Sequence, residues 1–533
     1  MCYYVSVLVV YLKIDMLAGQ MLMVGFDGCE FSSEHLELLK EVKPSGIILF
    51  GRNMVDSVQV RNLISDFKRS ALSLGLPPLI VAVDYEGGVV FRIGKDVTPL
   101  PSAMAIGATG NAKYAEIIAD VAGKELRWMG FNMNLAPVAD VNSNPMNPII
   151  GVRSFGDDPK LVASFVKSYI SSLQSHMVMA VAKHFPGHGA TEVDSHLDLP
   201  VVNEDVDILL RRELIPFKAA INSNVAAIMT AHVSFPKIDP SGLPATLSKA
   251  IINGLLREML GYDGLVVSDA LEMKAISDRF DVEEVVKCSV NAGVDLLLIS
   301  RDIDLMVNVK DCYVKVLKDG SVDKRHVLKS FQRLKNLRAK FYLYYSKLKA
   351  NVSSTFSNKH SCMVFNVCKR SLTLISGSPL HIDFSASKFF IFMPNRLKIF
   401  LSKFVGNVEK YFSKILAGKV RAVRFLSYDD EHLIDDPCSY LIGIGKDDLT
   451  IFFLYNAIFN RGQLNLYRKI RGCTSNLIAV VAGIPYDAVH VRDADAVYAT
   501  YGLTPLQLKA LGWTVFKGVK PSGTLPVKLS LNV

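Results

Sequence analysis

Imidazole and carboxylate side chains are concentrated in one short segment of this chain, KHFPGHGATEVDSHLDLP (183–200), which contains three of the eleven histidines. Proline and glycine residues in the segment oppose a continuing helix, so these groups are expected on a loop that follows a strand. The side chains able to do chemistry there are Lys183, His184, His188, Asp194, His196 and Asp198.

Three kinds of site fit such a set: a metal centre, a structural polar loop, or an acid/base and substrate-binding site. His184 and His188 are four residues apart, a spacing that suits zinc mainly when both side chains share one face of a helix. Gly187 and Gly189 argue against that helix. We therefore favour acid/base catalysis or substrate binding, and we expect no metal and no cofactor.

Other apolar runs also end in polar or charged residues. These residues are Asp84 with Glu86 and Arg92 after LIVAVD, Arg153 in GVRSFGDDP, His232 after IMTA, and Asp269 in LVVSDA. One buried carboxylate at a strand end is often only a loop cap. Several such groups at the ends of successive strands are costly to bury unless they are paired or used in function. The set suits polar, multi-hydroxyl substrates and glycosidic cleavage.

The elements that position these groups follow from eight short apolar runs in the first 300 residues. They are 19–26, 46–50, 79–84, 133–137, 178–185, 226–233, 265–270 and 294–300. The gaps can hold helices such as 111–129 and 204–223. Fully apolar strands that alternate with helices indicate a parallel sheet covered on both faces. Eight of them predict a TIM-type (β/α)8 barrel, with an open doubly wound sheet as the alternative.

A second domain is expected because 533 residues are too many for one hydrophobic core. A basic helical stretch (302–349) is followed by the polar segment NVSSTFSNKHS (351–361), which places the boundary between 1–350 and 351–533. Beyond it, FFIFMP (389–394), YLIGIG (440–445) and LIAVVAG (477–483) have the composition of buried strands. The second domain is therefore predicted to be an α/β sandwich.

Composition describes an ordinary globular chain, with 50% hydrophobic and 21% charged residues. Disordered, collagen-like and cysteine-scaffold proteins are thereby excluded. The formal net charge of +9 comes from residues 351–533, which carry 22 Lys and Arg against 12 Asp and Glu. A polyanion-binding domain or a lysine-rich solvated surface explains this excess. Because no tight basic cluster with interleaved aromatics is present, we expect no nucleic acid partner.

The mean hydropathy is +0.26, yet no run of about 18 apolar residues predicts a membrane span. Residues 2–12 are apolar but lack a basic start and a small-residue cleavage site. A packed first strand or a mistaken start codon explains them better than a secretory signal. The eight scattered cysteines favour a reducing compartment. We expect a cytoplasmic protein, with secretion as the alternative.

The motifs allow a more specific statement. KHFPGHGATEVDSH, with VDYEGG upstream and VVSDALEM downstream, resembles family 3 glycoside hydrolases of the bacterial β-N-acetylhexosaminidase branch. GQMLMVGFDG, GIILFGRN, NLAPVADVN and IIGVRSFGDDP extend the resemblance over about residues 18–300. IPYDA (484–488) and KPSGTLPVKL (520–529) resemble the second α/β domain of that family less closely.

The resemblance implies roles for individual residues. Asp269 matches the nucleophile that forms a covalent glycosyl-enzyme, His196 matches the general acid/base, and Asp194 matches its partner in an Asp–His dyad. The positions that match those binding the terminal sugar's hydroxyl and N-acetyl groups are Asp84, Arg92, Arg153, Lys183 and His184. Two departures concern binding detail: Ala270 and Val89 stand where the family often has Asp and Arg.

Physical chemistry is consistent with these roles. A retaining glycosidase needs a nucleophile and an acid/base roughly 5 Å apart. An ordinary Asp, with a pKa near ~4, is a poor proton donor at neutral pH, whereas an imidazole near ~6.5 is poised to give and take a proton. Asp194 can fix the tautomer of His196.

The expected function is a retaining exo-β-N-acetylglucosaminidase that acts on a small glycoside or muropeptide from peptidoglycan. Three alternatives stay open: a β-N-acetylglucosaminide phosphorylase, a β-glucosidase or xylosidase, and a non-catalytic sugar-binding protein. The sequence gives no oligomeric state.

Overall fold

The computed structural model describes residues 14–93, 96–343, 358–380, 383–429 and 437–529. The chain forms two compact units. The first contains 1–86, 118–150 and 162–355, and the second contains 87–117, 151–161 and 356–533. The expected boundary at 350/351 and the apolar residues 2–12 lie outside the described residues.

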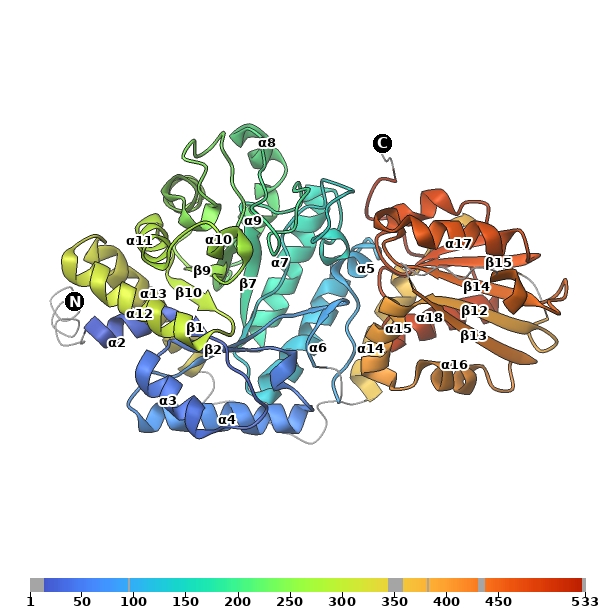
Figure 1. Ribbon diagram of the computed structural model, residues 1–533, viewed down its shortest axis with the longest axis horizontal. Helices are drawn as coiled ribbons and strands as arrows, with labels where there is room; N and C mark the ends of the chain where they lie inside the picture. The colour runs from blue at the N-terminus through green and yellow to red at the C-terminus, as the bar shows by residue number, and fades with distance from the viewer. Residues whose placement is uncertain (1–13, 94–95, 344–357, 381–382, 430–436, 530–533) are drawn as a thin grey trace. The chain divides into compact units, whose positions relative to one another are not determined.

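Eight parallel strands of the first unit close into a barrel in the order β1-β10-β9-β8-β7-β6-β3-β2, which Figure 1 shows in blue to yellow. The strands are β1 (Leu22–Val24), β2 (Gly46–Leu49), β3 (Ile80–Val83), β6 (Met133–Asn134), β7 (Met179–Phe185), β8 (Ala227–Thr230), β9 (Leu265–Ala270) and β10 (Leu296–Ile299). Each falls within one of the eight apolar runs, so the TIM-type barrel is confirmed. The open sheet is excluded by the pairing of β1 with both β2 and β10.

Two barrel strands carry local irregularities at the positions that matter for chemistry. The register between β7 and β8 shifts by one residue, because the four residues from Ala182 to Phe185 lie opposite only three residues of β8. The register between β9 and β10 shifts in the same way between Val267 and Ala270. An extra residue of this kind re-aims the side chains beside it. The irregular stretches contain Lys183 and His184 in β7, and Asp269 in β9.

Helices precede the first barrel strand, fill most of the segments between the strands, and follow the last one. They are α2 (Ile14–Gly19), α3 (Ser33–Val42), α4 (Ser57–Ser73), α5 (Ala103–Gly107), α6 (Lys113–Met129), α7 (Pro159–Ser175), α8 (Val206–Arg211), α9 (Leu214–Asn222), α10 (Lys274–Ser277), α11 (Val282–Ala292), α12 (Ile303–Asp319) and α13 (Lys324–Leu343). A π-helix, η4 (Ala250–Met259), precedes β9. The same part of the chain contains three 3-10 helices, η1 (Gly51–Asn53), η2 (Gly151–Arg153) and η3 (Ala245–Leu247). It also contains a two-stranded sheet of β4 (Tyr85–Gly87) and β5 (Val90–Phe91).

The helix expected over 111–129 is present as α6. The prediction of one helix over 204–223 is wrong. Helix α8 ends before Arg212, whose φ of −127° and ψ of −75° are not helical, and a second helix, α9, follows. The basic stretch 302–349 contains two helices, α12 and α13, separated at Gly320, whose φ of 81° is left-handed. Among the described residues, no helix is both long enough and apolar enough to cross a membrane.

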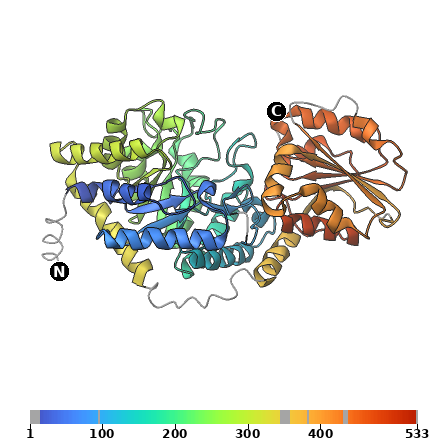
Figure 2. The same cartoon turned by 60° about the horizontal axis from the view of Figure 1, so that its bottom comes forward.

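The second unit is a three-layer sandwich around a mixed six-stranded sheet of order β11-β16-β15-β14-β12-β13, shown in orange and red in Figure 2. Its strands are β11 (Thr373–Gly377), β12 (Lys388–Pro394), β13 (Ala422–Tyr428), β14 (Leu449–Leu454), β15 (Asn476–Val481) and β16 (Ala496–Ala499). Its helices are α14 (Asn358–Ser371), α15 (Asn395–Val405), α16 (Val408–Leu416), α17 (Arg461–Arg471) and α18 (Pro505–Lys517), with 3-10 helices η5 (Pro437–Leu441), η6 (Ala457–Phe459) and η7 (Pro485–His490).

Successive side chains of β12 pack alternately on the two faces of this sheet, and both faces are buried. Phe389, Ile391 and Met393 pack with α15, α16 and α18. Phe390 and Phe392 pack on the opposite face with α17. The α/β sandwich expected for the second domain is confirmed.

One expected strand of this unit is wrong. The run YLIGIG (440–445) forms the end of η5 and a turn, and the strand lies further on, in β14. Gly443 has a φ of 78°, which a strand does not accommodate, and the side chain of Ile442 is 71% exposed. The glycines therefore outweigh the apolar composition.

Residues 87–117 and 151–161 belong to the second unit although they precede most of the barrel in sequence. Met104, Ala105 and Val152 share a hydrophobic cluster with Tyr486 and Tyr501. The Ser102 hydroxyl donates to the carbonyl oxygen of Tyr501 at 2.6 Å.

Candidate active site

The carboxyl ends of β3, β7 and β9 bear the charged residues that the sequence singles out. Asp84 directly follows β3, Lys183 and His184 lie near the end of β7, and Asp269 lies near the end of β9. Parallel strands of a closed barrel point the same way, so these ends meet at one rim, where barrel enzymes carry their active sites.

Lys183 joins two acidic residues at this rim. Its Nζ donates to Asp84 Oδ1 at 2.8 Å and lies 2.7 Å from Glu86 Oε1. Only 3% of the Lys183 side chain is exposed, so its positive charge is buried together with its counter-charges. The arrangement presents a carboxylate and an ammonium side by side, which suits the hydroxyl groups of a sugar.

Asp140 accepts hydrogen bonds from two histidines, His184 at the end of β7 and His188 just after it. Its Oδ2 lies 2.7 Å from His184 Nδ1, and its Oδ1 accepts the backbone N–H of His188 at 2.7 Å. Burial acts to raise the pKa of Asp140, but the neighbouring imidazoles outweigh it and hold that pKa below its usual value. The carboxylate therefore stays ionised and fixes the orientation of His184.

His188 braces the loop rather than facing outward. It is buried, with Nδ1 2.8 Å from Thr191 Oγ1 and Nε2 3.0 Å from Ser195 Oγ. The Thr191 hydroxyl donates to the His188 carbonyl oxygen, so it accepts from Nδ1, and Nε2 is left to accept from Ser195. His188 thus holds the start of the segment that carries the expected dyad.

Asp194 and His196 form a hydrogen-bonded pair on this loop. Asp194 Oδ1 lies 2.8 Å from His196 Nδ1 and also accepts the backbone N–H of His196 at 2.9 Å. The bond to His196 lowers the pKa of Asp194 below its usual value, although partial burial opposes the shift. The side chain of His196 is 59% exposed. Nε2 is the ring nitrogen that Asp194 does not contact.

Asp269 is a carboxylate set among positively charged and polar groups. Burial acts to raise its pKa, but the imidazole of His184, the N–H of Ala270 and the ammonium of Lys183 lower it below its usual value. The Ala270 N–H donates to Asp269 Oδ1 at 2.8 Å. An ionised carboxylate held at the barrel rim has the properties of a nucleophile.

His232 fixes the backbone beside Asp269. Its Nε2 donates to the Ala270 carbonyl oxygen at 3.0 Å, and its Nδ1 lies 2.7 Å from Thr246 Oγ1. Burial lowers the pKa of His232, so the ring is neutral at neutral pH. Glu272, two residues beyond Ala270, accepts the backbone N–H of Ser300 at 2.7 Å and so ties this segment to the end of β10.

Arg92 and Arg153 lie in the second unit. Arg92 follows β5, and Arg153 ends η2. The other six expected site residues belong to the barrel unit, where Lys183 contacts Asp84, and Asp194 contacts His196. His184 and Lys183 act electrostatically on Asp269.

The central residue that sequence reasoning missed is Asp140. It belongs to the run NLAPVADVN, and its position after an apolar strand was the available signal. Glu86, the second acidic partner of Lys183, stands near the end of an apolar run in the sequence, but nothing in the sequence assigns it a role.

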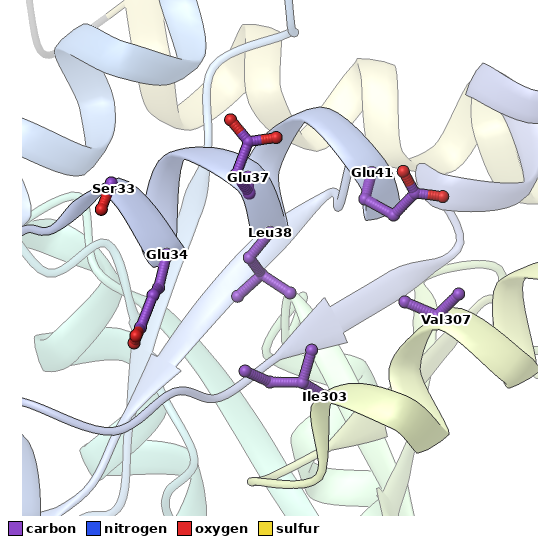
Figure 3. Close-up of a pocket in the computed structure, with 7 residues that line it drawn as sticks. All are labelled: Ser33, Glu34, Glu37, Leu38, Glu41, Ile303 and Val307. Carbon is purple, nitrogen blue, oxygen red and sulfur yellow. The ribbon is translucent and has the colours of Figure 1, made fainter.

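No group of three or more His, Cys, Asp or Glu among the described residues is arranged to hold a metal ion. A pocket elsewhere on the barrel lies between α3 and α12 (Figure 3). It is lined by Ser33, Glu34, Glu37, Leu38, Glu41, Ile303 and Val307, none of which belongs to the site.

Known proteins with related sequences settle the family. Residues 13–337 match the Glycosyl hydrolase family 3 N terminal domain. The chain belongs to glycosyl hydrolase family 3. The resemblance seen in the motifs is thereby confirmed.

Beta-hexosaminidase A of Pseudoalteromonas piscicida is 34% identical over 388 residues, which are 68% of this chain and 65% of that protein. A Beta-hexosaminidase of Xanthomonas campestris pv. campestris (strain B100) is 35% identical over 52% of this chain and 84% of its own length. This family 3 chain thus spans just under two thirds of the first relative.

One solved structure is similar over nearly the whole chain. The family 3 β-N-acetylglucosaminidase of Paenibacillus sp. str. FPU-7 has a TM-score of 0.89 and 34% identity, over 98% of this chain and all of that one. A family 3 barrel followed by an α/β sandwich is therefore the architecture of both proteins.

Proposed function

We propose that this family 3 protein is a retaining exo-β-N-acetylglucosaminidase that hydrolyses terminal GlcNAc from small glycosides. The observation that carries the proposal is the hydrogen-bonded Asp194–His196 pair, on the loop that follows the β7 rim. The similarity to proteins named beta-hexosaminidase and β-N-acetylglucosaminidase supports it.

In the first step, His196 gives its Nε2 proton to the glycosidic oxygen while Asp269 attacks the anomeric carbon. The bond between that carbon and the leaving oxygen breaks, and a bond to the Asp269 carboxylate forms. The lowered pKa of Asp269 keeps it ionised for this attack. Asp194 stabilises the orientation and the cationic form of the imidazole.

In the second step, His196 takes a proton from water, and the oxygen of that water attacks the anomeric carbon. The bond to Asp269 breaks, which releases the sugar and regenerates the ionised carboxylate. We assign sugar binding to Asp84, Lys183 and His184 on the barrel rim. For Arg92 and Arg153, the same role is proposed from the family resemblance alone. No step of this reaction needs a metal or a cofactor.

A phosphorylase is the second candidate, and the acid/base residue favours it specifically. An imidazole does not repel phosphate as a carboxylate does, so phosphate in place of water can attack the glycosyl-enzyme. A β-glucosidase or xylosidase of this family has less support, because such enzymes usually take an acid/base glutamate from the second domain. Glu409 there is paired with Lys398 at 2.8 Å, and Glu431 lies outside the described residues. A purely sugar-binding protein does not need the ionised Asp269.

We further propose muropeptides derived from peptidoglycan as natural substrates and the cytoplasm as the location, with secretion as the alternative. The decisive experiment is a panel of aryl β-glycosides assayed with and without free phosphate. Release of GlcNAc without phosphate supports hydrolysis, and release of GlcNAc-1-phosphate only when phosphate is present supports the phosphorylase. Preference for glucosides or xylosides over GlcNAc substrates contradicts the proposal.

A further inference from the structure

The loop that carries Asp194 and His196 touches the segment that follows Asp269 at two points. The backbone N–H of Ala275 donates to the Ser195 carbonyl oxygen at 3.4 Å. Arg279 Nη2 donates to Asp198 Oδ1 at 2.5 Å. One contact lies directly before His196 in sequence and the other lies two residues after it.

On the loop side, backbone hydrogen bonds link Asp198 to the Asp194–His196 pair. The backbone N–H groups of Leu197 and Asp198 both donate to the Asp194 carbonyl oxygen, at 2.9 and 3.1 Å. This single turn contains Asp194, His196 and Asp198. A restraint on the Asp198 carboxylate therefore acts on the same turn that carries the His196 imidazole.

On the other side, Arg279 is linked to the end of β9 through a short, hydrogen-bonded stretch. The backbone N–H of Met273 donates to the Ala270 carbonyl oxygen at 3.2 Å, and the backbone N–H of Arg279 donates to the Ile276 carbonyl oxygen at 3.0 Å. Ala270 is the residue after Asp269. The ion pair therefore connects the dyad to the segment that positions the carboxylate.

The tip of this loop is exposed to solvent. His196, Leu197 and Asp198 are exposed, and the Leu197 side chain is 69% exposed. On the other side, Ala275 and Ile276 of α10 are buried. Without dense packing around it, the position of the loop tip depends on its polar contacts, whereas the α10 side is held by its core.

We propose that Asp198 and Arg279 form a latch that positions the His196 imidazole relative to Asp269. Both are positioning residues, and neither is a catalytic residue. The inference rests on the proposed function, in which His196 is the acid/base. Because the two side chains are 60% and 46% exposed, dissolved salt screens their attraction, and the latch weakens as ionic strength rises.

The kinetic test compares Arg279→Ala and Asp198→Ala with the wild type on aryl β-GlcNAc substrates. With a poor leaving group, kcat is expected to fall about twofold to fivefold, the range of an exposed ion pair. With a dinitrophenyl leaving group, which needs little proton donation, it stays near wild type. KM changes little, because the residues that bind the sugar are untouched. The charge-swapped pair Asp198→Arg/Arg279→Asp restores most of the loss.

The matched control is Arg325→Ala, which removes another exposed arginine, paired with Asp323 at 2.9 Å and located at the start of α13. It is expected to leave both substrates unaffected. Raising the salt from ~10 mM to ~1 M lowers wild-type kcat on the poor substrate but leaves the Arg279→Ala rate unchanged. The latch is overturned if kcat of Arg279→Ala and Asp198→Ala falls equally on both substrates. It is also overturned if their kcat does not fall and salt has no effect on the wild type.

A second readout does not depend on turnover. Amide hydrogen exchange of residues 194–199 is expected to be several-fold faster in Arg279→Ala than in the wild type or in Arg325→Ala. If no GlcNAc substrate is turned over, the proposed function fails while this exchange result still judges the latch. Unchanged exchange in Arg279→Ala overturns it.

Discussion

Oδ2 of Asp140 lies 2.7 Å from Nδ1 of His184, and both side chains are buried at the rim of the barrel. The carboxylate comes from the segment after β6, and the imidazole comes from the end of β7. The contact engages Nδ1 of His184 and so fixes the orientation of the ring. It makes Asp140 an orienting residue for His184, which we propose binds the sugar.

Asp140→Asn tests this role. The amide keeps the shape of the side chain but loses the charge, and its NH₂ group cannot accept the hydrogen bonds that the carboxylate accepts. We expect kcat/KM to fall about tenfold to a hundredfold, and the free energy of unfolding to fall by about 1.5–3 kcal/mol, because hydrogen bonds to a buried carboxylate are lost. Steady-state kinetics and urea unfolding measure the two effects. An Asn variant with wild-type values of both contradicts the role.

Glu213 predicts a pH dependence of stability. This buried carboxyl group accepts from Ser143 Oγ at 2.9 Å and from Arg212, while its Oε2 is buried without a hydrogen-bond partner among the described residues. Burial raises its pKa from 4.5 to about 7. A raised pKa means that the folded state holds the proton more tightly. Its stabilising contribution is therefore complete below about pH 4.5 and is lost as the pH rises through 7.

Glu213→Gln, which cannot ionise, is expected to lack this loss. Between pH 5 and pH 8 the wild type should lose up to ~3 kcal/mol of unfolding free energy relative to the Gln variant. Thermal or urea unfolding at several pH values measures the difference. A constant difference across this range shows that Glu213 does not titrate there.

Chelation tests the assignment of the histidines. The Nδ1 atoms of His184 and His196 are bound by Asp140 and Asp194, and both ring nitrogens of His188 lie beside hydroxyl groups. Prolonged treatment with EDTA is therefore expected to leave activity unchanged. Activity lost to the chelator and restored by zinc contradicts the acid/base assignment and favours a metal site.

Asp269→Ala removes the carboxylate that we propose as the nucleophile. We expect kcat to fall by at least ~10³-fold, with little change in stability, because the covalent route is lost. Mass spectrometry of the wild type after reaction with a 2-fluoro glycoside is expected to place the trapped sugar on Asp269. A label on another residue, or a variant with a tenth of wild-type activity, rules out this role.

The barrel could be predicted from the sequence because its strands are mostly apolar and almost entirely buried. The dyad was also visible, since Asp194 and His196 are two residues apart and their contact is local. The contact between Asp140 and His184 spans 44 residues, and no spacing rule reveals it. The same holds for Asp198 and Arg279, which are 81 residues apart.

Local conformation explains the errors. YLIGIG has the composition of a strand, but the left-handed backbone of Gly443 makes it a turn. The 204–223 region has a helical pattern throughout, and the break at Arg212 coincides with its ion pairs to Glu204 and Glu213. Ion pairs of this kind can override the intrinsic helix propensity of a segment.

The most direct test of the central claim, that His196 is the acid/base, is the leaving-group dependence of His196→Ala. Protonation matters most when the departing oxygen is most basic, so its rate should fall steeply as the leaving-group pKa rises. Added azide should rescue the second step, Asp194→Ala should show a milder version of the same pattern, and Glu409→Ala and Glu431→Ala should resemble the wild type. Equal loss of His196→Ala on good and poor leaving groups, with the steep dependence in either Glu variant instead, would contradict the account.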